Sequence, residues 1–220
     1  MKPLVLAIDT THEFGSLALT SAITDEISLH APAGFGQVLY AHLGRLLARN
    51  GVEPGMIDCF AAASGPGSFT GVRVGLACIK GLAEACGKPA VAVGNLEAMA
   101  SFGTAPLRAV VMDARRGEVY GAVYDEAGRA VLPEVVAPFP AWLESLPDGV
   151  EFVSTDFTPF RASLTDTRFE DASVVTAPRA LAAAIAHIAC ARWLRGEACD
   201  PAALDANYVR RPDAELLWKE

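Results

Sequence analysis

The sequence predicts an α/β protein built from two similar lobes, each with a mixed β-sheet and helices. Two observations favour this fold class. The first is an apolar strand, a glycine turn and a long helix that follow one another between Cys59 and Cys86. The second is a three-strand pattern that begins near residue 4 and recurs near residue 109. The chain of 220 residues suffices for one large domain or for two lobes of about 100 residues, and either size buries an adequate core.

The composition indicates a compact, soluble protein. Hydrophobic residues make up 52% of the chain and charged residues 20%, so disorder is not expected. No apolar run resembles a membrane span, and the first residues lack the layout of a signal peptide, which favours a cytoplasmic protein. The net charge of -8 argues against an independent grip on nucleic acid, because that affinity comes largely from Lys and Arg.

The five cysteines and four histidines show no metal or disulfide pattern. The cysteines include no C-x-x-C pair and have mostly apolar neighbours, so we interpret them as reduced hydrophobic residues. No two histidines are three or four residues apart, so no local metal site is expected. The histidines are His12, His30, His42 and His187.

Residues 4–30 are predicted to form three strands joined by polar turns, with a helix only afterwards. This order disfavours a dinucleotide-binding Rossmann unit, in which a helix follows the first strand. Asp9 ends the first strand, and Thr10 follows it. A carboxylate and a hydroxyl at this place could face a phosphate or a magnesium ion. A simple Asx-type turn is the alternative.

A helix over residues 37–50 is expected next, closed by Gly51 in the left-handed capping position. A buried strand follows at 59–63, and a glycine turn at 65–67 leads into the long helix. The turn matches neither the phosphate-loop pattern nor G-x-G-x-x-G, so it is a weak nucleotide signature.

The long helix after this turn is apolar on two sides. Its second apolar side contains Val74, Cys78 and Leu82, and Gly71 and Gly75 leave a smooth patch there. Because a surface helix is normally apolar on one stripe, we infer that its own lobe covers one side and another protein the other. Enclosure within one large domain is the alternative. If another protein covers the second side, Gly75→Arg should block assembly and leave the fold intact. The partner-binding candidates on the two helices are Leu39, Leu43, Gly71, Val74, Gly75, Cys78 and Leu82.

The second half of the chain repeats the first. Residues 109–136 again give a strand that ends in an aspartate, Asp113, followed by a turn, a strand, a turn and a strand. Such a repeat is more specific than either aspartate alone. Two lobes packed face to face would bring Asp9 and Asp113 to a shared cleft, as in the actin-like ATPase fold (RNase H-like, ASKHA). The lobes are expected at 1–105 and 106–220, the second completed by an alanine-rich helix, with the tail a candidate to return to the first lobe.

Four segments carry a resemblance to a known family: AIDTT, ASGPGSFTGVRVGLACIKGLA, MDARRGEVY and NYVRRPDAEL. They resemble the TsaB (YeaZ) family, the bacterial partner subunit of the TsaD enzyme in making threonylcarbamoyladenosine on tRNA. The resemblance implies the actin-like fold. It also implies that the helices at 37–50 and 70–86 form a helical bundle with the same two helices of the catalytic partner. When the partner is absent, a second copy of this chain is expected to take its place. A TsaE-type ATPase is an expected member of the complex, and tRNA is expected to bind only through the complex.

These patterns favour a non-catalytic activating subunit that needs no cofactor. The resemblance implies that catalytic relatives hold a metal with a His-x-x-x-His pair, which this chain lacks, and its glycine-turn serines have no histidine nearby in sequence. Asp9, Thr10 and Asp113 are candidates for a vestigial nucleotide site. The sequence Ser154-Thr155-Asp156-Phe157 replaces the glycines that the fold uses for adenosine, which argues against independent nucleotide binding.

Two other functions remain open at this stage. One is an actin-superfold enzyme, a Mg-ATP-dependent small-molecule kinase or a hydrolase, that uses Asp9 and Asp113. The other is a structural homodimer with no catalytic client. The arginines in the second-lobe turn and in the tail are open between partner docking and simple solvation. They are Arg115, Arg116, Arg210 and Arg211.

Overall fold

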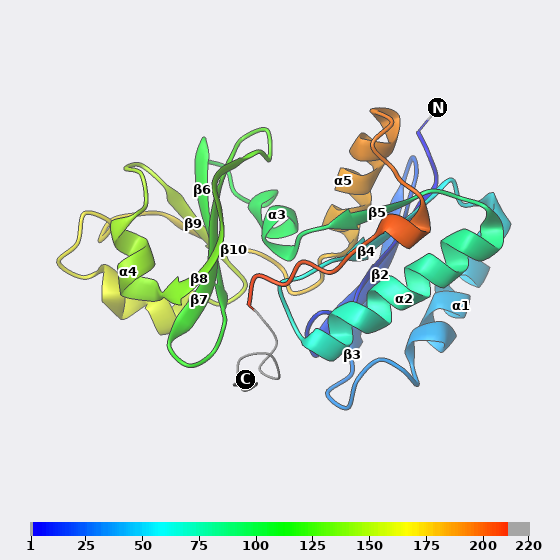
Figure 1. The fold of residues 1–220 in the computed structure, drawn as a ribbon, viewed down its shortest axis with the longest axis horizontal. Coiled ribbons are helices and arrows are strands. Elements are labelled where there is room, and N and C mark those ends of the chain that lie inside the picture. Colours follow the sequence, from blue (N-terminus) through cyan, green and yellow to red (C-terminus); the bar gives the residue numbers. More distant parts are fainter. Residues whose placement is uncertain (1, 211–220) are drawn as a thin grey trace, which may run out of the picture. The chain divides into compact units, whose positions relative to one another are not determined.

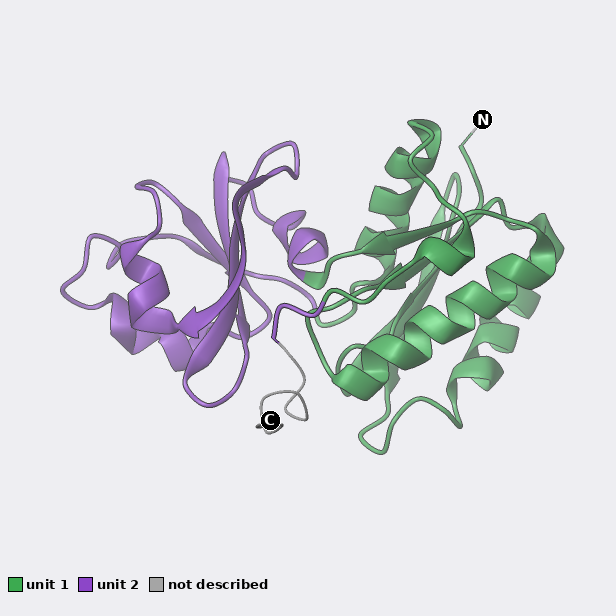
Figure 2. Ribbon diagram, in the orientation of Figure 1, with its two compact units in different colours: residues 1–95, 179–207 green, residues 96–178, 208–220 purple. Residues whose placement is uncertain are grey.

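The structure, a computed structural model, describes residues 2–210. The chain forms two compact units (Figure 2). Of the described residues, the first unit contains 2–95 and 179–207, and the second contains 96–178 and 208–210. No helix within residues 2–210 is both long enough and apolar enough to cross a membrane.

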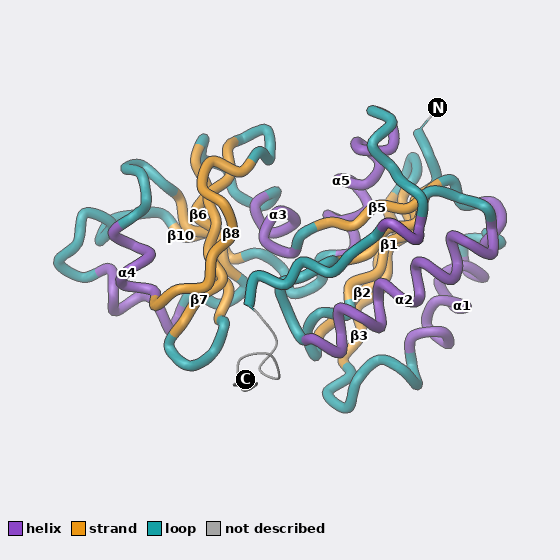
Figure 3. Tube along the Cα trace, viewed as in Figure 1, coloured by secondary structure: helices purple, strands orange, loops and turns teal. Residues whose placement is uncertain are grey.

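The first unit is a five-stranded sheet between two layers of helices (Figures 1 and 3). Its strand order is β3-β2-β1-β4-β5, in which β1 to β3 are antiparallel and β4 and β5 run parallel to β1. The elements are β1 (Val5–Asp9), β2 (Phe14–Thr20), β3 (Thr24–His30), α1 (Leu39–Arg49), η1 (Pro54–Met56), β4 (Cys59–Ala63), α2 (Phe69–Cys86), β5 (Ala90–Val93), α5 (Ala182–Leu194) and η3 (Pro201–Ala203).

Side chains alternate between the two faces of this sheet, as the pleat requires. Leu6 and Ile8 of β1 join a buried cluster with α1 and α2, which lie side by side on one face (Figure 1). Asp9 follows Ile8 and therefore turns to the opposite face. Its antiparallel partner Ser16 accepts a 2.9 Å hydrogen bond from the backbone N–H of Ala182, at the start of α5. Helix α5 thus covers the face to which Asp9 turns.

The second unit repeats this topology with shorter helices. Its strand order is β10-β9-β6-β7-β8, so a meander of three antiparallel strands again leads to two parallel ones. The elements are β6 (Leu107–Asp113), β7 (Glu118–Asp125), β8 (Ala130–Pro138), α4 (Phe139–Glu144), β9 (Glu151–Ser154), η2 (Thr158–Leu164) and β10 (Val174–Thr176). Helix α3 (Asn95–Ala100) lies at the change from the first unit to the second. The duplication predicted from the sequence is confirmed, and Asp9 and Asp113 end equivalent strands.

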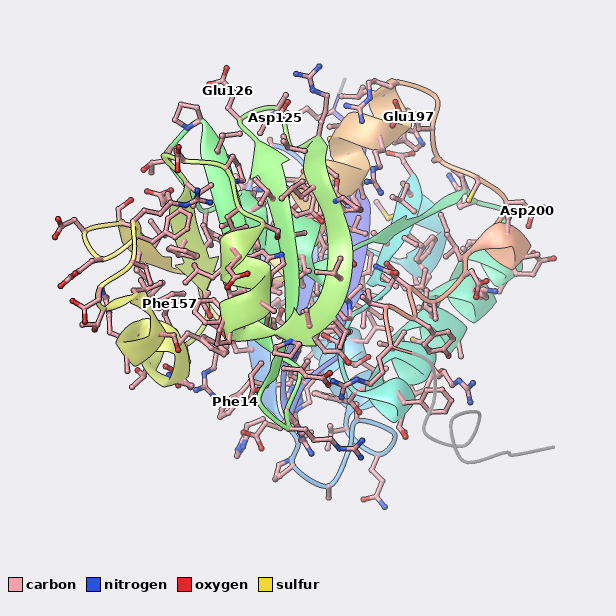
Figure 4. All side chains as sticks on the ribbon, turned by 60° about the vertical axis from the view of Figure 1, so that its left-hand side comes forward. Phe14, Asp125, Glu126, Phe157, Glu197 and Asp200 are labelled. Atoms are coloured by element: carbon pink, nitrogen blue, oxygen red, sulfur yellow. The ribbon has the colours of Figure 1, made fainter. Side chains whose placement is uncertain are left out.

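The core of the second unit is aromatic. Phe139 lies 5.0 Å from Phe160 and 6.0 Å from Phe157 between ring centroids, and Phe152 lies 5.1 Å from Phe157. Figure 4 shows Phe157 in this region, and it shows Asp125 and Glu126 at the turn between β7 and β8. The segment after β9, where the actin-like fold was expected to carry nucleotide-binding glycines, therefore contributes the buried Phe157 to the core.

The alanine-rich helix belongs to a different unit from the one that the sequence predicted. It was expected to complete the second lobe, yet α5 packs on β1, β2 and β4 of the first unit. Three of its alanines, Ala182, Ala186 and Ala189, are fully buried. Small side chains let a helix approach a sheet closely, so their role is clear only once the sheet is known.

Candidate functional sites

The turn after β1 holds a buried carboxylate. Asp9 is fully buried, and its Oδ1 accepts hydrogen bonds from the backbone N–H of Thr11 at 2.9 Å and from the Thr11 hydroxyl at 2.7 Å. This is the Asx-type arrangement that the sequence left open. The other oxygen, Oδ2, has no hydrogen-bond partner, and it is the one buried side-chain N or O atom of residues 2–210 in that condition. One oxygen of the carboxylate, Oδ1, therefore stabilises the turn, and the other, Oδ2, has no hydrogen-bond partner.

A side chain that the sequence analysis missed joins this turn to the glycine turn. Asn95 donates a 2.7 Å hydrogen bond from Nδ2 to the Thr11 hydroxyl, and its Oδ1 accepts from the N–H of Gly65 at 3.0 Å. The Asn95 N–H in turn donates to the Gly65 carbonyl at 2.8 Å. Ser68 N–H completes the link with a 2.7 Å bond to the Thr11 carbonyl. The two turns thus form one polar network inside the first unit.

Thr10 holds the first turn of α2 against the end of β1. Its hydroxyl donates to the carbonyl of Gly71 at 2.7 Å. A Cβ atom on Gly71 would lie 2.0 Å from the Thr10 carbonyl oxygen, and one on Gly75 would lie 2.7 Å from the Thr10 hydroxyl. The two glycines are needed for this close approach within the unit, and their assignment to partner binding stays a prediction.

The other predicted partner-binding residues also pack within their own unit. Leu39, Leu43 and Cys78 are buried in the core cluster of the first unit. Val74 and Leu82 are half-buried against the same cluster. The second apolar side of α2 is covered largely by the neighbouring elements of its own unit, including α1, and the sequence pattern alone does not show this.

A different face of α1 and α2 is exposed, and its residues are mostly small. We call it the small-residue face. A Cβ atom on Gly44 or Gly81 would meet no atom within 4 Å, so this surface is open. Two aromatic side chains flank it: Tyr40 is 63% exposed and Phe69 is 42% exposed. The small residues of this face are Ala41, Gly44 and Ala48 on α1 and Ala77, Gly81 and Ala85 on α2.

Tyr40 joins the two helices across this face. It makes a side-chain hydrogen bond with Cys78. The pKa of Tyr40 is raised, chiefly because negative charge on Cys78 would oppose a phenolate, and the hydrogen bond and burial add to the effect. Burial raises the pKa of the Cys78 thiol, against a smaller opposing effect of the same hydrogen bond. Both groups are thus neutral near pH 7. At the other end of α2, the guanidinium of Arg73 lies 3.6 Å from the centroid of the Phe69 ring.

Asp113 has surroundings unlike those of Asp9. It is exposed, and its Oδ1 accepts a 2.7 Å hydrogen bond from the N–H of Arg115. Arg210, which the sequence left open between docking and solvation, donates to the Ala114 carbonyl at 2.8 Å and pairs with the Glu118 carboxylate. Arg211 lies outside the described residues.

Two other candidate features, a metal site and the serine before α2, can be assessed in the part of the chain that the structure describes. No three His, Cys, Asp or Glu side chains of that part converge in a way that could hold a metal ion. Ser68 accepts a hydrogen bond from the N–H of Gly71 and so caps α2.

Comparison with known proteins places this fold and sequence in a family. The family model described as "TsaD: tRNA N6-adenosine threonylcarbamoyltransferase" matches residues 33–195. The "tRNA threonylcarbamoyladenosine biosynthesis protein TsaB" of Bacillus subtilis (strain 168) is 28% identical over 230 residues, which cover 98% of each chain. The protein of the same name from Escherichia coli (strain K12) is 37% identical over 151 residues, 60% of this chain and 64% of the relative.

A solved structure agrees with these relatives. "YeaZ from Pseudomonas aeruginosa" superimposes with a TM-score of 0.78 at 26% identity, and the match covers 93% of this chain and all of that one. The match includes both units, and the family model accounts for most of the sequence. The chain therefore has the two-lobed, actin-like α/β fold and belongs to the TsaB (YeaZ) family.

Proposed function

We propose that this protein takes part in the biosynthesis of threonylcarbamoyladenosine on tRNA as a non-catalytic, activating subunit. In this role it binds a TsaD-type catalytic subunit through the small-residue face of α1 and α2. The relatives named TsaB support the pathway. A homodimer through the same face is the expected state of the chain alone. A TsaE-type ATPase is a further expected member, and tRNA is expected to bind through the complex.

The single observation that supports this docking surface is that small side chains are exposed on two adjacent helices. Alanine and glycine at positions 77, 81 and 85 recur every fourth residue, so they form one line along α2. A second helix can approach these three positions closely, because none of them carries a long side chain; Arg73, one turn before Ala77, lies over the Phe69 ring. Tyr40 and Phe69 at its margins are of the aromatic kind that contributes most to protein interfaces.

The roles of the polar residues support a subunit that does not itself perform the transfer. The glycine turn, which held the candidate nucleophiles, is engaged in structure: Ser68 caps α2, and the Ser64 carbonyl accepts from the N–H of Asn207 at 2.8 Å. Oδ1 of Asp9 is used within its own turn. The chemistry is therefore assigned to the TsaD-type partner.

The experiment that tests the docking surface compares two alanine substitutions. Ala77→Arg places a long charged side chain in the middle of the small-residue face. Ala191→Arg, at an exposed position of α5 on the other face of the sheet, makes the same chemical change. Size-exclusion chromatography with the catalytic subunit should show the heterocomplex for wild type and Ala191→Arg, and its loss for Ala77→Arg. Equal assembly by both variants would remove the small-residue face from the interface.

The Mg-ATP enzyme remains a second candidate because of one observation. The unpartnered, buried Oδ2 of Asp9 is an oxygen of the kind that magnesium prefers. Isothermal titration of the isolated chain with ATP and magnesium separates the two functions. Micromolar binding that disappears in Asp9→Ala would favour the enzyme, and persistence of a homodimer in the presence of the catalytic subunit would favour the homodimer with no client.

A further inference from the structure

We propose that the polar network around Thr11 positions His12 as a base: it fixes the ring hydrogen of His12 on Nδ1 and leaves Nε2 as the proton acceptor. The inference does not depend on the proposed function. It follows from which atoms of four neighbouring side chains can donate a hydrogen and which can only accept one. The four side chains are Asp9, Thr11, His12 and Asn95.

The first step concerns the orientation of the Asn95 amide. A backbone N–H can only donate, so the 3.0 Å contact with the N–H of Gly65 requires the amide oxygen, Oδ1, on that side. The amide nitrogen, Nδ2, then lies 2.7 Å from the hydroxyl oxygen of Thr11. Because Nδ2 can only donate, the Thr11 hydroxyl accepts this bond.

The second step concerns the hydroxyl hydrogen of Thr11. Oδ1 of Asp9 accepts a 2.9 Å hydrogen bond from the Thr11 N–H, and it lies 2.7 Å from the Thr11 hydroxyl oxygen. An ionised carboxylate has no hydrogen to give, so the hydroxyl is the donor in this second contact. The single hydrogen of the Thr11 hydroxyl is therefore used on Asp9.

The third step places the hydrogen of His12. Its Nδ1 lies 3.0 Å from the same hydroxyl oxygen. A hydroxyl group has one hydrogen and two lone pairs, and Asp9 and Asn95 use the hydrogen and one lone pair. What remains for His12 is a lone pair, so Nδ1 must be the donor. The contact thus requires the Nδ1–H form of the neutral ring.

This arrangement determines what the other ring nitrogen can do. When Nδ1 of a neutral imidazole carries the hydrogen, Nε2 has a lone pair and can take a proton or accept a hydrogen bond. Asp9 is fully buried, whereas His12 is exposed. The Thr11 hydroxyl therefore links a buried carboxylate to a base on the surface, and protonation of that base at Nε2 leaves the Nδ1 bond in place.

The test measures the tautomer of each histidine in the full chain. Long-range ¹H–¹⁵N NMR spectra at pH 8, where an ordinary histidine is neutral, distinguish the two forms of the ring. His12 should show the Nδ1–H form alone. His30 is the internal control, because it is exposed and stacks on the Phe14 ring with 4.4 Å between ring centroids; it should show a mixture of both forms. As the pH is lowered, His12 should gain its proton at Nε2 and keep the Nδ1 hydrogen.

Two substitutions of Thr11 test the cause. Thr11→Ser keeps the hydroxyl group and should keep the single Nδ1–H form of His12. Thr11→Val has nearly the same shape but no hydroxyl, so His12 should return to a mixture like that of His30. The spectra of wild type and Thr11→Ser decide the inference even where Thr11→Val does not fold.

Three results would overturn the inference. An Nε2–H form of His12 in wild type would mean that the Thr11 hydroxyl donates to the ring and that Asp9 holds the proton. A mixture equal to that of His30 would mean that the contact has no fixed direction. A single Nδ1–H form that persists in folded Thr11→Val would show that the hydroxyl is not its cause. Assembly with a TsaD-type subunit is measured separately, so the proposed function stands or falls independently of these spectra.

Discussion

The hydroxyl group of Thr10 donates a hydrogen bond to the carbonyl oxygen of Gly71, with 2.7 Å between the two oxygens. This bond joins the end of β1 to the first turn of α2. It forms only because glycine at positions 71 and 75 lets the helix backbone come that close. Gly71 and Gly75, which the sequence suggested as part of a docking patch, are therefore the place where α2 packs on its own sheet.

We expect Gly71→Ala to be strongly destabilising. The added Cβ would lie 2.0 Å from a backbone oxygen of Thr10, which cannot rotate away, so helix and strand must separate. The expected loss in the free energy of unfolding is about 3 kcal/mol or more, at the upper end for overpacked sites. Urea denaturation measures it. By the same argument Gly75→Arg, predicted from the sequence to leave the fold intact, is now expected to disrupt it.

Gly81→Ala is the matched control, because Gly81 lies in the same helix with open space around it. Alanine has the higher helix propensity, so this variant should gain about 0.5–1 kcal/mol. Equal effects at positions 71 and 81 would contradict the close approach of α2 to β1.

The sequence predicted much of the fold and little of the site. The apolar strands, the repeat and the strand-end aspartates predicted both sheets, and the glycine turn predicted that a long helix follows it. The exposed side of α2 was not predictable, because Gly71 and Gly81 look alike in sequence while one is against a strand and the other is open. That difference depends on how the helix lies on the sheet and beside α1. The spacing of apolar residues in the sequence does not show this placement.

Asn95 was missed for a related reason. Its partner Thr11 is 84 residues away along the chain. An asparagine at the start of a short helix is typical of a capping residue, and nothing local distinguishes it from one that links two turns. Similarly, the sequence does not predict the left-handed φ angles of Arg115 and Arg116, because arginine has no preference for such positions.

We expect Asn95→Ala to destabilise the first unit by about 1–3 kcal/mol, the range for leaving buried polar groups unsatisfied. The N–H of Gly65 would lose its acceptor, and the Thr11 hydroxyl would lose a donor. Asn50→Ala removes an exposed amide that bonds to Asp25, and it should cost about 0.5 kcal/mol. Chemical denaturation of the two variants measures both changes, and an equally small effect of Asn95→Ala would show that the network is dispensable.

Glu151 should make stability depend on pH in the acid range. It is 4% exposed, and burial raises its pKa. Hydrogen bonds from the N–H groups of Thr104 and Ala105 and from the hydroxyl groups of Thr104 and Ser173 together outweigh burial, so the pKa is lowered from 4.5. A lowered folded-state pKa means that the stabilisation is present above pH 4.5 and is lost as pH falls through the folded value. Glu151→Gln should therefore be less stable than wild type at pH 7, with a difference that shrinks below pH 4.5.

The exposed Glu144→Gln provides the control for this pH dependence. Thermal melts of the three proteins between pH 7 and pH 3 make the comparison. A constant difference between Glu151→Gln and wild type across that range would mean that the carboxylate charge does not contribute to stability.

The Cys59 thiol should be chemically inert in the folded protein. Its pKa is raised to about 12, chiefly by burial and in addition by negative charge on Cys190, Cys199 and Asp58. Since the thiolate is the nucleophile, iodoacetamide at pH 8 should modify the exposed Cys199 and spare Cys59, as mass spectrometry of peptides can show. A pKa raised from 9.0 also means that the stabilisation is present below pH 9 and is lost as pH rises towards 12. Labelling of Cys59 as fast as Cys199 in the native protein would show that β4 opens readily, and unfolding in urea should make the two rates alike.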